Sequence, residues 1–222
     1  MSLRSCILSL GFLILSACGG GQSDSLVGKA EAPELPEPPT EIEIVDIDPS
    51  LLKEGGYVLF FRHTTRDPEA ADLDMNFIDR NGICVVGSQL NAQGEAEARK
   101  LGEVFRAQEY LVGDIYTSPS CRTKQMSELA FGTTGDVVLW AGRPPTWAAD
   151  EVESMNTELI NHLATEPPAG TNTLILSHGS LYDSIFKVNY NLLQGDAGVY
   201  KPVGDGNYEF VGLLRKEVWI QL

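Results

Sequence analysis

Two hydrophobic runs that each lead into a histidine constrain the fold of this chain more than any other feature. Residues 57–61 precede Arg62 and His63, and residues 173–177 precede His178. Short apolar runs of this kind are typical of buried strands. In a parallel α/β sheet, ligands bind where the strands end, because strand C-termini and helix N-termini meet at that edge. The pattern therefore predicts two histidines and an arginine at one ligand-binding edge, a combination suited to phosphate.

The rest of the sequence predicts alternating strands and helices. The expected helices cover about residues 92–111, 118–131, 150–165 and 181–190, and the further strands cover about 114–117, 137–140, 198–202 and 208–215. Asn91 can cap the first helix, whose apolar stripe includes Ala98, Leu101 and Phe105. This alternation favours a three-layer α/β/α sandwich with a mostly parallel central sheet.

The N-terminal segment, residues 1–17, predicts a signal peptide. It combines Arg4 with an apolar run over 7–15, which is shorter than the roughly 20 residues of a membrane span. The residues around Cys18 resemble a bacterial lipoprotein signal, which implies a diacylated Cys18 as the new N-terminus; a plain secretory signal is the alternative. Gly19 rather than Asp after this cysteine implies sorting to the outer membrane of a Gram-negative host. We expect a lipid-anchored envelope protein that faces the periplasm.

The chain after the signal peptide divides into a tether and a domain. Residues 18–49 are rich in Gly, then in Pro and acidic residues, and such a stretch buries too little apolar surface to fold. Residues 42–47 alternate imperfectly between apolar and acidic, which leaves a short edge strand open. Residues 50–222 are expected to form one domain with its own core.

Charge and cysteine content narrow the setting. The formal net charge is −15, which disfavours nucleic acid and anionic membrane surfaces as partners. Cys6 is lost with the signal and Cys18 is lipidated, so Cys84 and Cys121 remain as a candidate disulfide in an oxidising compartment. Two thiols without a Cys-x-x-Cys spacing predict no structural zinc site.

Four short blocks carry a family resemblance. They are Arg62–His63, Leu90–Gly94, Ser118–Thr123 and Leu176–Gly179. In order and spacing they resemble the histidine phosphatase superfamily, over residues 56–190. Within the superfamily, the chain is similar to the phosphoglycerate mutase-like branch, because Gly179 follows the second histidine.

This resemblance implies a phosphatase that uses neither a metal ion nor an organic cofactor. It would hydrolyse a small phosphomonoester through a phosphohistidine on His63. Arg62, Arg122 and a protonated His178 would form the phosphate pocket and stabilise the transferring group by position and charge.

The general acid is the least constrained residue. In this branch it is commonly a carboxylate near the helix start after the third strand, where Asp150, Glu151 and Glu153 lie. We expect Glu151, because the helix begins there, and we expect burial to raise its pKa.

Departures and alternatives remain. Thr64 and Thr65 stand where the family usually has a glycine and an acid, which affects the shape of the pocket.

A mutase would need a lid, for which residues 66–89 are the candidate, but a secreted location favours hydrolysis. A catalytically silent phosphate-binding lipoprotein is the alternative from another class. His162 lacks comparable neighbours in sequence and is expected at the surface or at the boundary of the core. The oligomeric state stays open.

Overall fold

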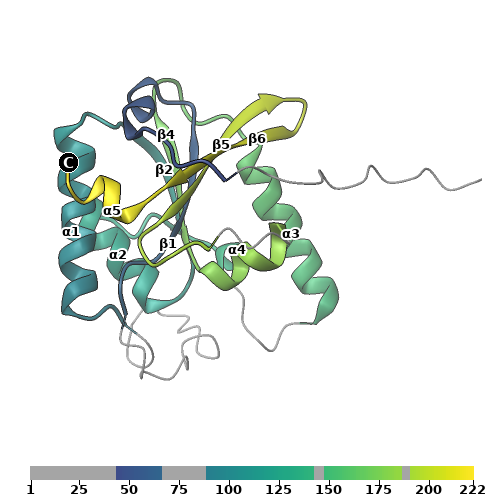
Figure 1. The fold of residues 1–222 in the computed structure, drawn as a ribbon. Helices are drawn as coiled ribbons and strands as arrows, with labels where there is room; N and C mark the ends of the chain where they lie inside the picture. Colours follow the sequence, from purple (N-terminus) through teal and green to yellow (C-terminus); the bar gives the residue numbers. More distant parts are fainter. Residues whose placement is uncertain (1–43, 67–88, 143–147, 187–190) are drawn as a thin grey trace, which may run out of the picture. The chain divides into compact units, whose positions relative to one another are not determined.

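Within the described residues, six strands form a single sheet (Figure 1). The computed structural model describes residues 44–66, 89–142, 148–186 and 191–222. In chain order the strands are β1 (Val58–Arg62), β2 (Val112–Thr117), β3 (Asp136–Val137), β4 (Asn172–Ser177), β5 (Ala197–Gly204) and β6 (Asn207–Leu214). Their spatial order is β3-β2-β4-β1-β5-β6. β3, β2, β4 and β1 run parallel, whereas β5 is antiparallel to both of its neighbours.

Helices cover both faces of this sheet. They are α1 (Ala92–Ala107), α2 (Cys121–Phe131), α3 (Ala149–Leu163), α4 (Gly179–Phe186) and the short α5 (Lys216–Trp219), with 3-10 turns η1 (Pro49–Glu54) and η3 (Leu139–Ala141). α1 and α2 lie on one side, and α3 and α4 lie on the other (Figure 1). The predicted three-layer sandwich with a mostly parallel sheet is confirmed. None of the helices formed by the described residues is long and apolar enough to cross a bilayer.

β1 shows how the sequence separates the two layers. Leu59 and Phe61 point toward α1 and α2, where Phe61 contacts Phe105. Val58 and Phe60 point the other way, where Phe60 packs on Tyr182 of α4. Side chains alternate between faces along a strand, so a continuous apolar run is what a centrally placed strand requires. The run thus fixes β1 as a core strand.

The compact unit begins upstream of residue 50. Ile47 is buried, its backbone N–H donates to the Leu213 carbonyl at 2.9 Å, and the Leu213 N–H donates to the Val45 carbonyl at 2.8 Å. Asp46 forms an isolated parallel bridge at the same point. One buried isoleucine and these bonds hold the last residues of the expected tether against β6. Residues 1–43, which include the predicted signal peptide and Cys18, lie outside the described residues.

Two expected elements end earlier than the periodicity indicated. α1 stops at Ala107 because Glu109 adopts a positive φ of 60°, which reverses the chain and buries Tyr110. The strand expected over 137–140 is only Asp136–Val137, because η3 follows and buries Trp140. Asn91 caps α1 as expected, its Oδ1 accepting the Gly94 N–H at 2.9 Å. Ala98, Leu101 and Phe105 are buried as predicted.

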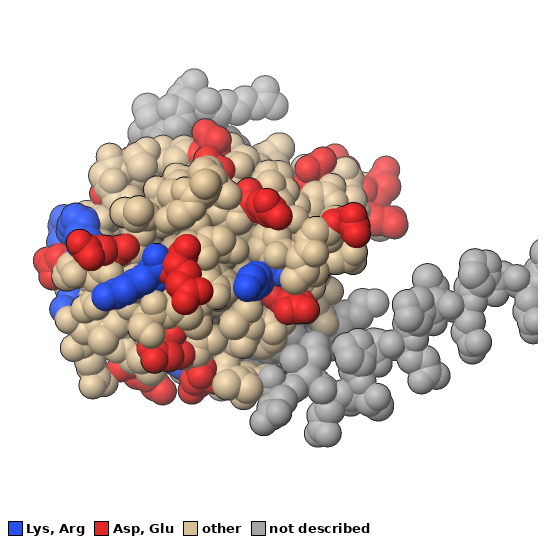
Figure 2. Space-filling view, turned by 90° about the horizontal axis from the view of Figure 1, so that it is seen from above, with Lys and Arg blue, Asp and Glu red and all other residues tan. Residues whose placement is uncertain are grey.

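Acidic side chains dominate the charged surface where the parallel strands begin. Figure 2 shows them scattered over this end of the domain, with fewer Lys and Arg among them. No broad basic area interrupts them in this view. On this face, the acidic residues of the chain therefore lie at the solvent-exposed surface.

Gly102 provides a test of the packing between α1 and α2. A Cβ at this position would lie on the carbonyl oxygen of Ala130 in α2. We expect Gly102→Ala to lower the free energy of unfolding by about 2 kcal/mol, because overpacking outweighs the gain of about 1 kcal/mol in helix propensity. Urea unfolding measures this. The exposed neighbour Glu103→Ala should change stability by less than about 0.5 kcal/mol, and equal effects of both variants would contradict the close approach.

Candidate active site

The parallel pairing of β1 with β4 brings the two histidines together. Arg62 is in register with Ser177, and the backbone N–H of His63 donates to the Ser177 carbonyl at 3.1 Å. The His63 and His178 rings lie 5.5 Å apart between centroids, at an interplanar angle of 63°. Each residue is 3% exposed. The strand ends thus form a shielded site with two facing imidazoles.

A hydrogen bond to the neighbouring backbone selects the tautomer of His63. Its Nδ1 lies 2.8 Å from the Thr64 carbonyl oxygen, which can only accept. Nδ1 therefore carries the proton, and Nε2 keeps its lone pair. Burial, with the Arg122 charge next in size, lowers the pKa of His63 to about 3. His63 is accordingly a neutral imidazole with an available nitrogen nucleophile.

His178 differs from the protonated group that was expected from the sequence. Arg122 Nη2 lies 3.2 Å from His178 Nδ1, and a guanidinium can only donate, so Nδ1 accepts. The other ring nitrogen, Nε2, lies 2.8 Å from Ser118 Oγ and donates to it. Burial and then the charge of Arg122 hold the pKa of His178 well below its ordinary value. The expectation of a protonated His178 is wrong for the free site, because that proton would face a guanidinium.

Arginines supply the positive charge of this edge. Arg62 Nη1 donates to the Leu192 carbonyl at 2.7 Å, and its side chain passes so close to Gly179 that a Cβ there would meet it at 3.1 Å. Arg122 is 3% exposed, in the first turn of α2. Arg66, which sequence reasoning missed, acts with both of them to lower the pKa of each histidine. Three guanidiniums beside two neutral imidazoles favour an anion, despite the net charge of −15.

Helix N-termini reinforce this preference. α4 begins at Gly179, directly after His178, and α2 begins at Cys121, after Ser120. Ser120 Oγ also lies 3.4 Å from His178 Nε2, so both helix starts adjoin the same ring. Their backbone N–H groups and positive dipole ends favour bound anions. Only the strand-end position of Ser118 and Ser120 hinted at these contacts with His178.

Glu151 binds the start of its own helix and is exposed. Its carboxylate accepts the Ala148 backbone N–H at 2.8 Å and caps the start of α3. Glu151 is exposed, as are Asp150 and Glu153. The expected burial of a carboxyl group is therefore not found, because a helix N-terminus binds this side chain instead. The role of Glu151 as general acid stays a prediction.

The remaining predicted residues concern cysteines and metals. Cys121 is disulfide-bonded. Cys84, the partner expected from the sequence, lies outside the described residues, as does most of the possible lid over 66–89. Among residues that the structure does describe, no group of three or more His, Cys, Asp or Glu is placed to hold a metal ion.

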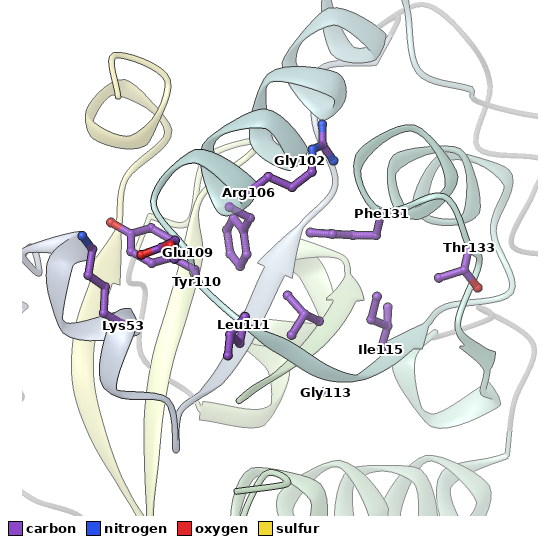
Figure 3. Close-up of a pocket in the computed structure, with 12 residues that line it drawn as sticks. Lys53, Gly102, Arg106, Glu109, Tyr110, Leu111, Gly113, Ile115, Phe131 and Thr133 are labelled. Atoms are coloured by element: carbon purple, nitrogen blue, oxygen red, sulfur yellow. The ribbon is translucent and has the colours of Figure 1, made fainter. Parts of the chain in front are cut away.

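A separate cavity of about 870 Å³ lies at the far end of α1 (Figure 3). Phe105, Ile115 and Phe131 supply much of its apolar lining, and Lys53 and Arg106 lie at it as well. α1 begins beside Thr65, and the lining starts at Gly102, ten residues after the first residue of α1, so the cavity begins about 15 Å from the histidine end of the helix. Its described lining contains no histidine. The chemistry of the protein is therefore assigned to the histidine edge.

Comparison with known proteins gives likeness of fold at low identity. No protein-family model matches the chain, and no curated protein matches it. Among solved structures, the protein histidine phosphatase SixA complexed with tungstate is 15% identical with a TM-score of 0.46, covering 73% of this chain and 98% of that one. A phosphoserine phosphatase mutant from Entamoeba histolytica, in complex with phosphoserine, is 11% identical with a TM-score of 0.48, covering 72% and 98%.

A third neighbour is a protein from Escherichia coli K-12 provisionally described as an alpha-ribazole-5'-P phosphatase. It is 11% identical with a TM-score of 0.48, covering 73% of this chain and 97% of that one. All three descriptions name phosphatases. At these identities and TM-scores, the likenesses do not place the chain in a family.

The low pKa of His63 predicts a distinctive response to acid. Below pH 6.5, the ordinary pKa of histidine, the unfolded chain binds a proton at His63. The folded protein binds this proton only near pH 3, because the pKa of His63 is lowered to about 3. This contribution to stability is therefore complete above pH 6.5 and falls with pH between those values, by about 1.4 kcal/mol per pH unit. His178 acts in the same direction.

NMR titration of the imidazole nitrogens checks this prediction. His63 should remain neutral at pH 5 and protonate near pH 3. Urea unfolding should show a weaker pH dependence for His63→Gln than for the unaltered protein. A His63 midpoint near 6.5 would refute the assigned environment.

Proposed function

We propose that this protein is a metal-independent phosphatase that hydrolyses a small phosphomonoester through a phosphohistidine on His63. The observation that carries the proposal is the buried, neutral His63, with its lone pair on Nε2, among three arginines. Guanidiniums can neutralise the phosphoryl oxygens, and a neutral imidazole can attack phosphorus. The resemblance in sequence to histidine phosphatases agrees with this chemistry.

The first step transfers the phosphoryl group to the protein. Arg62 and Arg122 bind the non-bridging oxygens, and His63 Nε2 attacks phosphorus in line with the ester oxygen. The N–P bond forms as the P–O ester bond breaks, and the alcohol leaves with a proton from a general acid. The Thr64 carbonyl accepts from Nδ1–H throughout and stabilises the charge that develops on the ring.

The second step returns His63 to its starting state. Water attacks phosphorus and gives its proton to the deprotonated general acid, the N–P bond breaks, and inorganic phosphate leaves. We assign neutral His178 the task of holding Arg122 through its Nδ1 and contributing to the pocket, rather than a cationic role in the free site. Because the arginines bear the positive charge, the site needs no metal ion for charge neutralisation.

Glu151 is our candidate general acid, and its present position sets a condition on that role. Its carboxylate would have to leave the Ala148 N–H and approach the ester oxygen. The exposure of Glu151 favours a second candidate function, a silent protein that binds a phosphorylated ligand without turnover. Retention of the whole nucleophile geometry supports the enzyme over this alternative.

The cellular setting is also a proposal. The lipoprotein-like segment before Cys18 supports an anchored protein of the cell envelope, facing the periplasm from the outer membrane. Its substrate would then be a small phosphomonoester met in that compartment. The acidic domain surface supports a role that involves neither nucleic acid nor anionic lipid.

Replacing the nucleophile tests the proposal directly. We expect the purified protein to hydrolyse p-nitrophenyl phosphate in the presence of EDTA, and His63→Ala to lower kcat by at least about 1,000-fold. Binding of inorganic phosphate, measured by calorimetry, should persist in His63→Ala because the arginines remain. His162→Gln is the matched control, since this third histidine stacks on Trp140, which is not among the residues assigned to the pocket. An unaltered protein that binds phosphate without turnover would establish the silent alternative.

The leaving group decides the role of Glu151. A general acid matters for alkyl phosphates and little for p-nitrophenyl phosphate, whose phenolate leaves without a proton. We expect Glu151→Gln to lower kcat about 100-fold for an alkyl phosphate and less than about threefold for the aryl ester. Glu153→Gln, also exposed on α3, is the control. Equal effects of Glu151→Gln on both esters would remove Glu151 from the mechanism.

A further inference from the structure

A buried carboxylate outside the phosphate pocket contacts the segment that carries the nucleophile. Glu97 lies in the second turn of α1 and is 4% exposed. Its Oε2 accepts the Thr65 backbone N–H at 3.0 Å and the Thr65 hydroxyl at 2.8 Å. Its Oε1 accepts from Lys216 Nζ at 2.7 Å and from Gln93 Nε2 at 2.9 Å. Both oxygens therefore have two donors each.

These donors keep Glu97 ionised inside the protein. Burial alone raises the pKa of a carboxyl, but the bonds from Lys216, Thr65 and Gln93 outweigh it, so the pKa of Glu97 is lowered. A buried ion pair seldom adds much net stability, because desolvating two charges offsets their attraction. A gain in stability therefore explains the Glu97–Lys216 ion pair poorly. The residues that contact the pair suggest a role in positioning instead.

Glu97 is connected to His63 through two residues of backbone. The Thr64 carbonyl that accepts from His63 Nδ1 belongs to the peptide unit whose N–H, at Thr65, donates to Glu97. One peptide group therefore faces the imidazole with its oxygen and the carboxylate with its nitrogen. The direction of the carbonyl depends on what holds the N–H.

Further bonds tie the same turn to the start of α1. Thr64 Oγ1 donates to the Gly94 carbonyl at 2.8 Å, and the Asn91 N–H donates to the Thr65 carbonyl at 3.2 Å. Gly94 permits this approach, because a Cβ there would overlap the Thr65 carbonyl oxygen. Glu97 completes the set by binding both the backbone N–H and the hydroxyl of Thr65.

Lys216, near the C-terminal end of the sequence, holds Glu97 in place through its side chain. Its backbone N–H donates to Asp196 Oδ1 at 2.8 Å, and its side chain packs on Gly195. The Gly195 N–H lies 3.1 Å from the carbonyl oxygens of both Arg62 and His63. The loop with Gly195 and Asp196 therefore contacts Lys216 and also holds the backbone of His63. Glu97 and this loop thus act on the same residue, His63.

We propose that Glu97 and Lys216 are positioning residues that fix the Thr64–Thr65 peptide and thereby hold the His63 ring in the tautomer and orientation needed for attack on phosphorus. The catalytic part of this inference rests on the proposed phosphatase function. The conformational part does not, since it concerns the ring in the free protein. Neither residue needs to touch the substrate.

The experiment measures the ring and the reaction separately. Long-range ¹H–¹⁵N NMR reports the tautomer of each histidine, and the full chain has only three, so His63→Gln suffices to assign the His63 signals. The variants are Glu97→Ala, Lys216→Met and the double variant Glu97→Gln/Lys216→Met. Glu95→Gln is the matched control on the same helix, because the Glu95 side chain is 46% exposed and its ion pair is with Arg99 of that helix, at 4.0 Å.

The unaltered protein and Glu95→Gln should show one His63 tautomer, with the proton on Nδ1. Glu97→Ala should show averaged tautomer signals, and kcat for p-nitrophenyl phosphate should fall about 10- to 100-fold with little change in KM. For Lys216→Met, both the tautomer averaging and the loss of kcat should lie between those of the unaltered protein and those of Glu97→Ala. The double variant should recover the single tautomer and most of kcat, because the amide oxygen that Glu97→Gln introduces still accepts from Thr65 and no unpaired charge remains.

Two results would overturn the inference. One is a lower melting temperature in Glu97→Ala with a single Nδ1–H tautomer and unchanged kcat, which would leave Glu97 a purely structural role. The other is a double variant that folds, keeps its melting temperature and still shows averaged tautomers. If the unaltered protein lacks phosphatase activity, the proposed function fails, and the NMR comparison alone decides whether Glu97 and Lys216 fix the ring.

Discussion

The parallel register between β1 and β4 is the constraint on which the site depends. Arg62 lies opposite Ser177, and each strand then continues into a histidine at the same edge. A shift of one residue would turn the side chains of one strand to the opposite layer, and Phe60 and Phe61 would exchange environments. The register is therefore fixed by the buried apolar residues on both faces. The chemistry at the strand ends follows from the packing of the strands themselves.

Once the histidines are adjacent, the surrounding charges determine their protonation. Burial disfavours an imidazolium ion, and the arginines disfavour it further, so both rings stay neutral at physiological pH. Hydrogen bonds then give the rings opposite tautomers: His63 donates from Nδ1, whereas His178 accepts there from Arg122. The same guanidiniums that attract an anion thus also keep the nucleophile unprotonated. The arginines thus contribute to both anion binding and nucleophilicity, with burial as the larger cause of the neutral rings.

The sequence allowed prediction of the strands that end in histidine, the α1 cap at Asn91 and the layered fold, because each follows from local patterns of apolar and capping residues. It also indicated that Arg62, His63 and His178 share one edge. It did not indicate that His178 is neutral in the free site, because the bond from Arg122 depends on how α2 lies against β4. It did not predict that the Glu151 carboxylate accepts the Ala148 N–H, because the composition of a helix start does not reveal whether a carboxylate caps its own helix. Glu97 and Lys216 were missed because their pairing joins residues 119 positions apart.

The contact between Thr65 and Lys216 spans 151 positions, which bears on when the site can form. β1 is made early, yet the lysine beside it belongs to the last helix described, and Trp219 of that helix secures the Gly195 carbonyl through its indole N–H at 3.0 Å. Contacts this distant close late in folding, after local helices have formed. A nascent chain that has passed β4 but not α5 would carry both histidines and all three arginines without Lys216. Completion of the site is therefore linked to completion of the domain.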